Sequence, residues 1–169
     1  RGLFQHFKKV AEESYEPILL YNVPGRTACT LGVETTLELS HVPGIIGIKD
    51  ATGDMDAAKN IGKGAKSGFI KLSGDDSTYA EYMFQLGQGI ISVGSHIIPE
   101  IFLQITELAI KKDFEGARQM QAAYKNLIDA LYVESNPIPI KKALQLRQTI
   151  ATAVIRLPLI KASQATQEK

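Results

Sequence analysis

Short apolar runs recur along the first part of the chain. Each run is rich in β-branched and aliphatic residues and is bounded by turn residues, and together they cover positions 17–23, 45–49, 69–73 and 89–93. Continuous apolar runs of this length are typical of strands that are buried on both faces, as in parallel sheets. The pattern therefore predicts four buried strands.

Stretches with a helical period separate these runs. Apolar residues recur every three or four positions before the first run and over 33–42 and 55–65, and Asp54 stands where it can cap the later helix. Asp76 or Ser77 is expected to begin the helix that precedes the fourth strand. Regular alternation of strands and helices indicates βαβ units around a parallel sheet, so the predicted fold class is α/β.

The pattern changes after the fourth strand. Helical periodicity continues over 99–112, 114–134 and 137–147. The last residues, 163–169, are polar and are expected to fray. The chain therefore ends in a region that we expect to be entirely helical.

Two domains follow from this change. Residues 1–112 carry the βα units, and residues 113–169 form a C-terminal helical domain. A closed (β/α)8 barrel needs eight units. The periodicity by itself leaves open whether the four units belong to a barrel or stand alone as a doubly wound sheet.

Composition excludes several classes of protein. The 169 residues are 44% hydrophobic and 22% charged with a formal net charge of +1, which is too balanced for an electrostatic nucleic-acid binder. No apolar run approaches the roughly 18 residues of a membrane span. The single cysteine, Cys29, excludes an internal disulfide and fits a reducing compartment, so we expect a cytoplasmic protein. The three histidines lack zinc-type spacing, and no metal is expected.

The residues best suited to chemistry follow the predicted strands. In parallel α/β folds, functional groups collect at the carboxyl ends of the strands. Lys49 ends the second run, and burial of its amine favours the neutral form that adds to a carbonyl to make a Schiff base. The alternative is a strand-end lysine that reaches solvent or pairs with an acid.

Neighbouring strand ends supply further candidates. Tyr21 can relay protons during imine formation, or it can simply fill the core, and Arg26 suits capture of a carboxylate, or it is an ordinary surface arginine. The adjacent acids Asp75 and Asp76 suggest a metal site, but capping of the helix that follows explains them better.

Five segments together are more specific than any one of them. They read Tyr-Asn-Val-Pro-Gly-Arg-Thr (21–27), Gly-Ile-Lys-Asp-Ala-Thr-Gly-Asp (47–54), Leu-Ser-Gly-Asp-Asp (72–76), Gly-Ile-Ile-Ser-Val (89–93) and Asn-Pro-Ile-Pro-Ile-Lys (136–141). In this order and spacing the chain resembles the dihydrodipicolinate synthase family. These are pyruvate-dependent class I aldolases, a group that also holds N-acetylneuraminate lyase.

The resemblance implies a fold and a reaction. The fold is a (β/α)8 TIM barrel with an α-helical C-terminal domain, and the four βα units here correspond to the C-terminal half of that barrel. The reaction condenses pyruvate with aspartate 4-semialdehyde to give 4-hydroxy-tetrahydrodipicolinate in lysine and diaminopimelate biosynthesis. No metal or organic cofactor is implied, because the lysine is itself the electron sink. Members of the family are usually homotetramers.

The resemblance also assigns residues to roles. Lys49 matches the Schiff-base lysine, and Tyr21 matches the tyrosine of the proton relay. Arg26 matches the arginine that holds the carboxylate of aspartate semialdehyde, while Gly74 and the backbone carbonyl of Ile91 are assigned to the substrate pocket. The alternatives are another lyase of the family acting on a sialic or keto-sugar acid, and a non-catalytic assembly module.

The chain also departs from the family pattern. The first four βα units have no counterpart here, and with them the paired threonines that bind the pyruvate carboxylate. The chain is therefore interpreted as an incomplete fragment, inactive alone, whose partner is the missing half or a second copy. Interior side chains of the half-barrel are then expected to face an open side, among them Leu19, Ile46, Ile48, Leu72 and Ile91.

Overall fold

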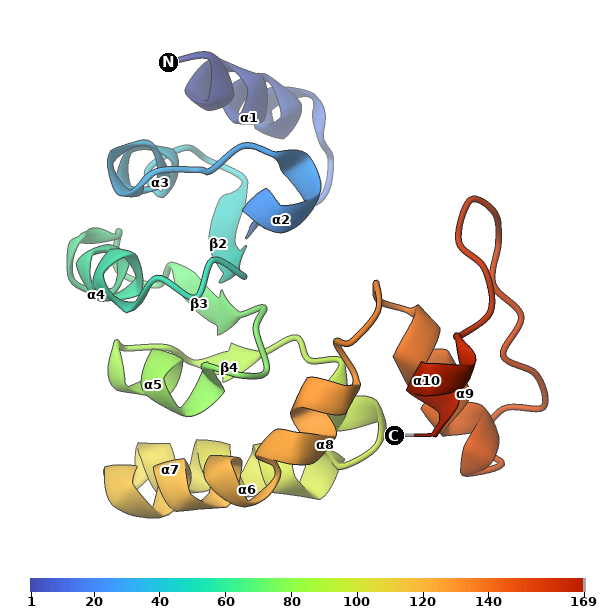
Figure 1. Cartoon of the computed structure of the whole chain (residues 1–169). Coiled ribbons are helices and arrows are strands. Elements are labelled where there is room, and N and C mark those ends of the chain that lie inside the picture. Colours follow the sequence, from blue (N-terminus) through green and yellow to red (C-terminus); the bar gives the residue numbers. More distant parts are fainter. Residues whose placement is uncertain (169) are drawn as a thin grey trace. The chain divides into compact units, whose positions relative to one another are not determined.

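The computed structural model describes residues 1–168 and divides the chain into two compact units (Figure 1). The first unit is Arg1–Ile91, and the second begins at Ser92. The domain boundary expected between residues 112 and 113 lies inside the second unit, because helix α6 (Pro99–Ile110) packs against helix α7 (Phe114–Ala123).

The first unit is built on a four-stranded parallel sheet, which confirms the predicted strands and their direction. The strands lie in the order β1-β2-β3-β4. They are β1 (Ile18–Asn22), β2 (Ile45–Asp50), β3 (Ile70–Ser73) and β4 (Gly89–Ile90). β4 is shorter than predicted, since the strand itself covers only Gly89 and Ile90.

Helices lie before and between these strands, as the periodicity predicts, and a short helix that was not predicted, α2 (Pro24–Thr27), follows β1. The others are α1 (Gly2–Glu13), α3 (Val33–Leu39), α4 (Met55–Gly64) and α5 (Tyr79–Phe84). The predicted cap of α4 is confirmed, because the Asp54 carboxylate accepts a hydrogen bond of 2.9 Å from the backbone N–H of Ala57. α5 begins at Tyr79, later than predicted, because the Asp75 carboxylate bonds to Ser77 and Thr78 in the turn before the helix.

Only one face of the sheet is covered within the described chain. Leu20 and Ile48, on adjacent strands, are almost completely buried against Leu39 of α3 and Ile61 of α4. The opposite face carries Leu19, Tyr21, Lys49, Leu72 and Ile91, all half-buried or exposed. We call this second surface the open face. The prediction that the strands are buried on both faces is therefore wrong for this chain.

The structure also corrects the prediction for Ile48. This residue was expected on the open side of the half-barrel, but it has no exposed surface. Ile18 pairs with Ile45 and Leu19 pairs with Gly47, so β2 holds one extra residue, Ile46, at a shift in register. Strict alternation would place positions three apart on opposite faces. Ile48 faces away from its neighbour Lys49 by ordinary alternation, and the shift lets Ile45 enter the same core.

The second unit contains η1 (Gly94–His96), α6, α7, α8 (Lys125–Ala130), α9 (Ile138–Leu146) and α10 (Gln164–Gln167). The helix predicted over 114–134 is interrupted at Tyr124, where α7 ends and α8 begins. Within the described residues, no helix has the length and apolar character needed to cross a membrane.

The polar tail departs from the expected fraying. The Ser163 hydroxyl caps α10 by accepting from the backbone N–H of Thr166, and it donates a hydrogen bond of 2.7 Å to the Glu134 carboxylate. Hydrogen bonds from the Thr166 hydroxyl, the Ser163 hydroxyl and the Ser163 backbone N–H lower the pKa of Glu134. The last residue of the predicted frayed segment, Lys169, lies outside the described residues.

Candidate active site

Lys49 and Tyr21 lie side by side on the open face. The two residues are register partners on neighbouring strands, and both come near the carboxyl ends of those strands. The Lys49 Nζ atom lies 4.1 Å from the centroid of the Tyr21 ring, which is the geometry of a cation–π contact. Tyr21 keeps 47% of its surface exposed. The amine and the phenol are thus adjacent and open to a small molecule.

Gly74 closes the other side of the lysine. It follows β3, and its backbone N–H donates a hydrogen bond of 2.7 Å to the Asp50 carbonyl at the end of β2. An ideal Cβ atom placed on Gly74 would lie 2.8 Å from the Lys49 Cε atom. The structure therefore brings Lys49, Tyr21 and Gly74 together.

Arg26 lies on the single-turn helix α2, which directly follows β1, and it is exposed. The loop that carries it is fixed by Asn22, a residue that the sequence analysis did not single out. The Asn22 side chain donates to the Leu31 carbonyl and accepts from the Leu31 backbone N–H, both at 3.0 Å. An amide at the end of an apolar run was the only sequence signal for this role.

Ile91 directly follows β4. Its backbone N–H donates a hydrogen bond of 2.9 Å to the Ser73 carbonyl, which continues the pairing of β3 and β4 beyond Ile90. Its side chain is 46% exposed. Since alternation places it on the face of Leu72 and Gly89, Ile91 belongs to the open face.

A buried acid lies behind the lysine. Asp50 follows Lys49 in β2, its side chain is on the covered side, and only 4% of the residue is exposed. Burial raises the pKa of Asp50, and hydrogen bonds from the Thr52 hydroxyl and backbone N–H partly oppose this rise. Burial, together with the nearby Asp50 carboxylate, also raises the pKa of Tyr82.

The acids after Gly74 organise a turn. The Asp75 carboxylate accepts hydrogen bonds of 2.9 Å from the Ser77 hydroxyl and 2.7 Å from the Thr78 hydroxyl, while Asp76 is fully buried. In the described part of the chain, no three His, Cys, Asp or Glu side chains converge in a way that could hold a metal ion.

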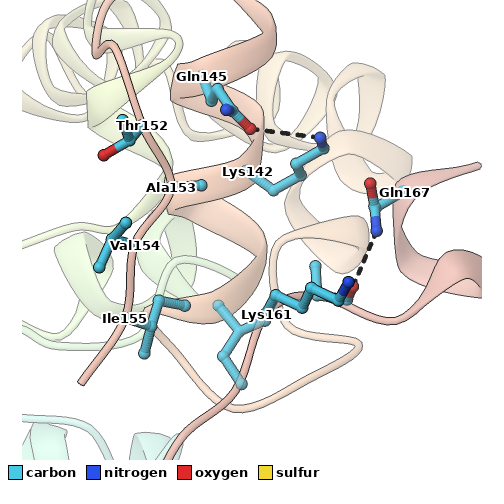
Figure 2. Close-up of a pocket in the computed structure, with 10 residues that line it drawn as sticks. Lys142, Gln145, Thr152, Ala153, Val154, Ile155, Lys161 and Gln167 are labelled. Atoms are coloured by element: carbon cyan, nitrogen blue, oxygen red, sulfur yellow. Dashed lines mark hydrogen bonds between the residues drawn. The ribbon is translucent and has the colours of Figure 1, made fainter. Parts of the chain in front are cut away.

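The second unit has a cavity of its own, of about 440 Å³. Figure 2 shows that α9, α10 and the segment between them line it. Lys142 donates to the Gln145 side chain at 3.3 Å, and the Gln167 side chain donates to the Ala162 carbonyl at 2.9 Å. The cavity contains none of the residues that the sequence analysis assigned to the site.

The sequence of the chain is similar to those of known enzymes. A model of the dihydrodipicolinate synthetase family matches residues 1–169. The 4-hydroxy-tetrahydrodipicolinate synthase of Bdellovibrio bacteriovorus is 48% identical over 160 residues, which cover 95% of this chain and 55% of that protein. The synthase of Pseudomonas putida is 44% identical over 168 residues, covering 99% of this chain and 57% of that protein. The chain thus spans little more than half the length of these relatives.

Solved structures agree with the sequence matches. The dihydrodipicolinate synthase of Aquifex aeolicus superimposes with a TM-score of 0.93 at 35% identity, over 99% of this chain and 57% of that one. The chloride-inhibited enzyme of Acinetobacter baumannii, solved with pyruvate, gives 0.92 at 41% identity over the same shares. The α/β fold of this chain is therefore that of these enzymes, and the chain belongs to the dihydrodipicolinate synthetase family.

Proposed function

We propose that this chain is the C-terminal half of a 4-hydroxy-tetrahydrodipicolinate synthase and that Lys49 carries its covalent chemistry. The observation that carries the proposal is the position of the Lys49 amine, 4.1 Å from the centroid of the Tyr21 ring, on the open face. A primary amine beside a phenol at the carboxyl ends of parallel strands suits Schiff-base formation with a keto acid. Pyruvate is the keto acid we infer, because it is named in the solved structure of the Acinetobacter relative.

The first half of the reaction uses the lysine and the tyrosine. The neutral Lys49 amine adds to the pyruvate ketone, and the resulting carbinolamine loses water to give an imine. Tyr21 relays the protons that leave the nitrogen and reach the departing hydroxyl. Loss of a methyl proton from the imine then gives an enamine, whose carbon is nucleophilic.

The second half joins the two substrates. The enamine carbon attacks the aldehyde of aspartate semialdehyde, whose carboxylate is held by the Arg26 guanidinium. The substrate amine then displaces the Lys49 nitrogen from the imine carbon, which closes the ring and frees the lysine. The relatives named as synthases favour this substrate over a sialic or keto-sugar acid.

The other half of the site is inferred to lie in an N-terminal half-barrel. The chain spans 55–57% of its relatives, and Tyr21 and Ile91 on its open face are nearly half exposed. Four further βα units would close the barrel over this face and supply the groups that bind the pyruvate carboxylate. We infer that this complete barrel, assembled as a homotetramer, is the active form.

The proposal is tested by trapping the imine. The full-length protein that contains these residues is treated with pyruvate and borohydride, which reduces an imine to a stable secondary amine. Peptide mass spectrometry is expected to place one pyruvyl adduct on Lys49. Lys71, on β3, is the matched control lysine of the same sheet and is expected to stay unmodified. An adduct on Lys71 or Lys141, or no adduct, would overturn the assignment.

A further inference from the structure

The backbone conformation at Gly74 does not require a glycine. The glycines with a positive φ in the described chain are Gly44, Gly53 and Gly68, and Gly74 is not among them. Its conformation is therefore open to residues with a side chain, and the reason for a glycine lies in the space around it.

That space is filled by Lys49. A Cβ atom on Gly74 would lie 2.8 Å from Lys49 Cε, 3.1 Å from Lys49 Cγ and 2.9 Å from Ala51 Cβ. Contacts below 3.0 Å are essentially never seen for real Cβ atoms, so a side chain here forces something to move.

The surrounding backbone has little freedom to give way. The backbone N–H of Gly74 donates to the Asp50 carbonyl at 2.7 Å, and the backbone N–H of Ala51 donates to the Asn22 carbonyl at 2.9 Å. These hydrogen bonds tie the ends of β1, β2 and β3 together. The Lys49 stem, with four rotatable bonds, is the part that moves most easily.

We propose that Gly74 is a positioning residue for Lys49. Its missing side chain leaves room for the Lys49 stem, which thereby holds the amine over the Tyr21 ring where it meets the keto acid. This inference rests on the proposed function of Lys49 and adds a steric requirement to it. Displacing a reacting group by about 1 Å can cost about 100-fold in rate, so the gap matters for the chemistry.

The test compares two glycines of the same sheet. Gly74→Ala places a methyl group against the Lys49 stem. In the control, Gly89→Ala, the new Cβ atom would lie at an ordinary 3.5 Å from Leu72 Cδ2, its one contact within the described residues. In the full-length protein, Gly74→Ala is expected to slow imine trapping on Lys49 by roughly tenfold to a hundredfold. Gly89→Ala is expected to leave the trapping rate within about twofold of the parent protein, because it shifts no reacting group.

A double variant separates positioning from folding. Gly74→Ala combined with Ala51→Gly removes the 2.9 Å contact between the two Cβ atoms and keeps the contact with Lys49. Thermal unfolding of the double variant is expected to approach that of the parent protein, while imine trapping stays slow. Recovery of the trapping rate together with stability would show a structural role only and would overturn the proposal.

A second measurement does not depend on pyruvate chemistry. Lysines methylated with ¹³C-formaldehyde and cyanoborohydride, which reduces the imine to a methylamine, give NMR signals, and the Lys49 signal is assigned from its loss in Lys49→Arg. The ring current of Tyr21 is expected to shift this signal upfield in the parent protein and in Gly89→Ala, but not in Gly74→Ala. An unchanged shift in Gly74→Ala overturns the positioning role. A missing adduct in the parent protein overturns the proposed function, and the NMR result still decides on Gly74.

Discussion

Arg26 lies in the segment between β1 and α3, and hydrogen bonds hold the two ends of this segment together. The buried amide of Asn22 holds both backbone groups of Leu31, so the chain from the end of β1 to the start of α3 is closed on itself. Within this closed segment, Arg26 is an exposed residue of α2. A rigid support of this kind limits the entropy lost when a flexible side chain binds its ligand.

Arg26→Ala is therefore expected to affect the second substrate and not the first. In the full-length protein, the loss of a bidentate carboxylate contact is expected to cost about 2–4 kcal/mol in kcat/KM for aspartate semialdehyde. Imine trapping with pyruvate is expected to stay within about twofold, because Arg26 makes no contact with pyruvate in the proposed reaction. Arg156→Ala, at an exposed arginine of the second unit, is the control. Unchanged turnover in Arg26→Ala, or cleavage of sialic acid by the parent protein, would favour the lyase alternative.

Asp50, the residue after Lys49, makes the stability of the fold depend on pH. Its pKa is raised by burial above the ordinary value of 3.8, so the folded chain binds a proton at Asp50 more tightly than the unfolded chain does. The free energy of unfolding therefore falls as the pH rises from below 3.8 through the folded pKa, and it is then constant with respect to this group.

Asp50→Asn removes the ionisable group, so the fall in the free energy of unfolding with rising pH is expected to disappear. Urea unfolding of both proteins between pH 3.5 and pH 7 should show the variant gaining stability relative to the parent protein as the pH rises. The hydrogen bond from the Thr52 hydroxyl favours the ionised carboxylate, so its loss in the variant offsets part of this gain at higher pH. Thr52→Val controls for this loss. A difference between parent and variant that is the same at every pH would contradict the assignment to Asp50.

At the scale of the elements, local sequence patterns predicted that strands and helices alternate, but they predicted little of how these elements pair and pack. The four parallel strands and the Asp54 cap are local features, which depend on hydrophobic period and on one side-chain hydrogen bond. The shift at Ile46 depends on how β1 and β2 pair, so the β2 sequence alone could not place Ile45 in the helix-covered core together with Ile48. The anchoring of the polar tail depends likewise on a tertiary contact, the hydrogen bond from the Ser163 hydroxyl to the Glu134 carboxylate.

In the candidate site, too, some features were predictable from the sequence and others were not. Lys49 and Tyr21 were predictable neighbours because each ends a strand of a parallel sheet, and strand ends meet at one edge. Asn22 and Gly74 were not predictable as supports. The partner of Asn22 is across a loop, and the space that Gly74 leaves is used by a side chain of the adjacent strand. Roles of this kind depend on register, which the sequence pattern does not specify.

At the scale of the whole molecule, the open face is the feature that remains without a cover in the described chain. Tyr21 and Ile91 on it keep 47% and 46% of their surfaces exposed, and Lys49 and Leu72 are only half-buried. Burying a large aliphatic side chain contributes roughly 1.5–3 kcal/mol. A few such residues therefore amount to a large share of the 5–15 kcal/mol that stabilises a typical domain. A cover on this face would stabilise the first unit and complete the site at once.

The expected cover is an N-terminal half-barrel, and co-expression tests it. The chain is expressed with the part of the Bdellovibrio synthase that precedes its matching segment. The two are expected to purify as one complex and to show condensation activity that neither has alone. Ile91→Glu, which adds a charge to the open face, is expected to weaken the complex. Leu146→Glu, at a residue of α9 in the second unit that is exposed to 64%, is the control and is expected to leave the complex intact. A monodisperse monomer of the 169-residue chain, with cooperative unfolding and measurable condensation activity, would show that the open face needs no cover and that Lys49, Tyr21 and Arg26 suffice for the reaction.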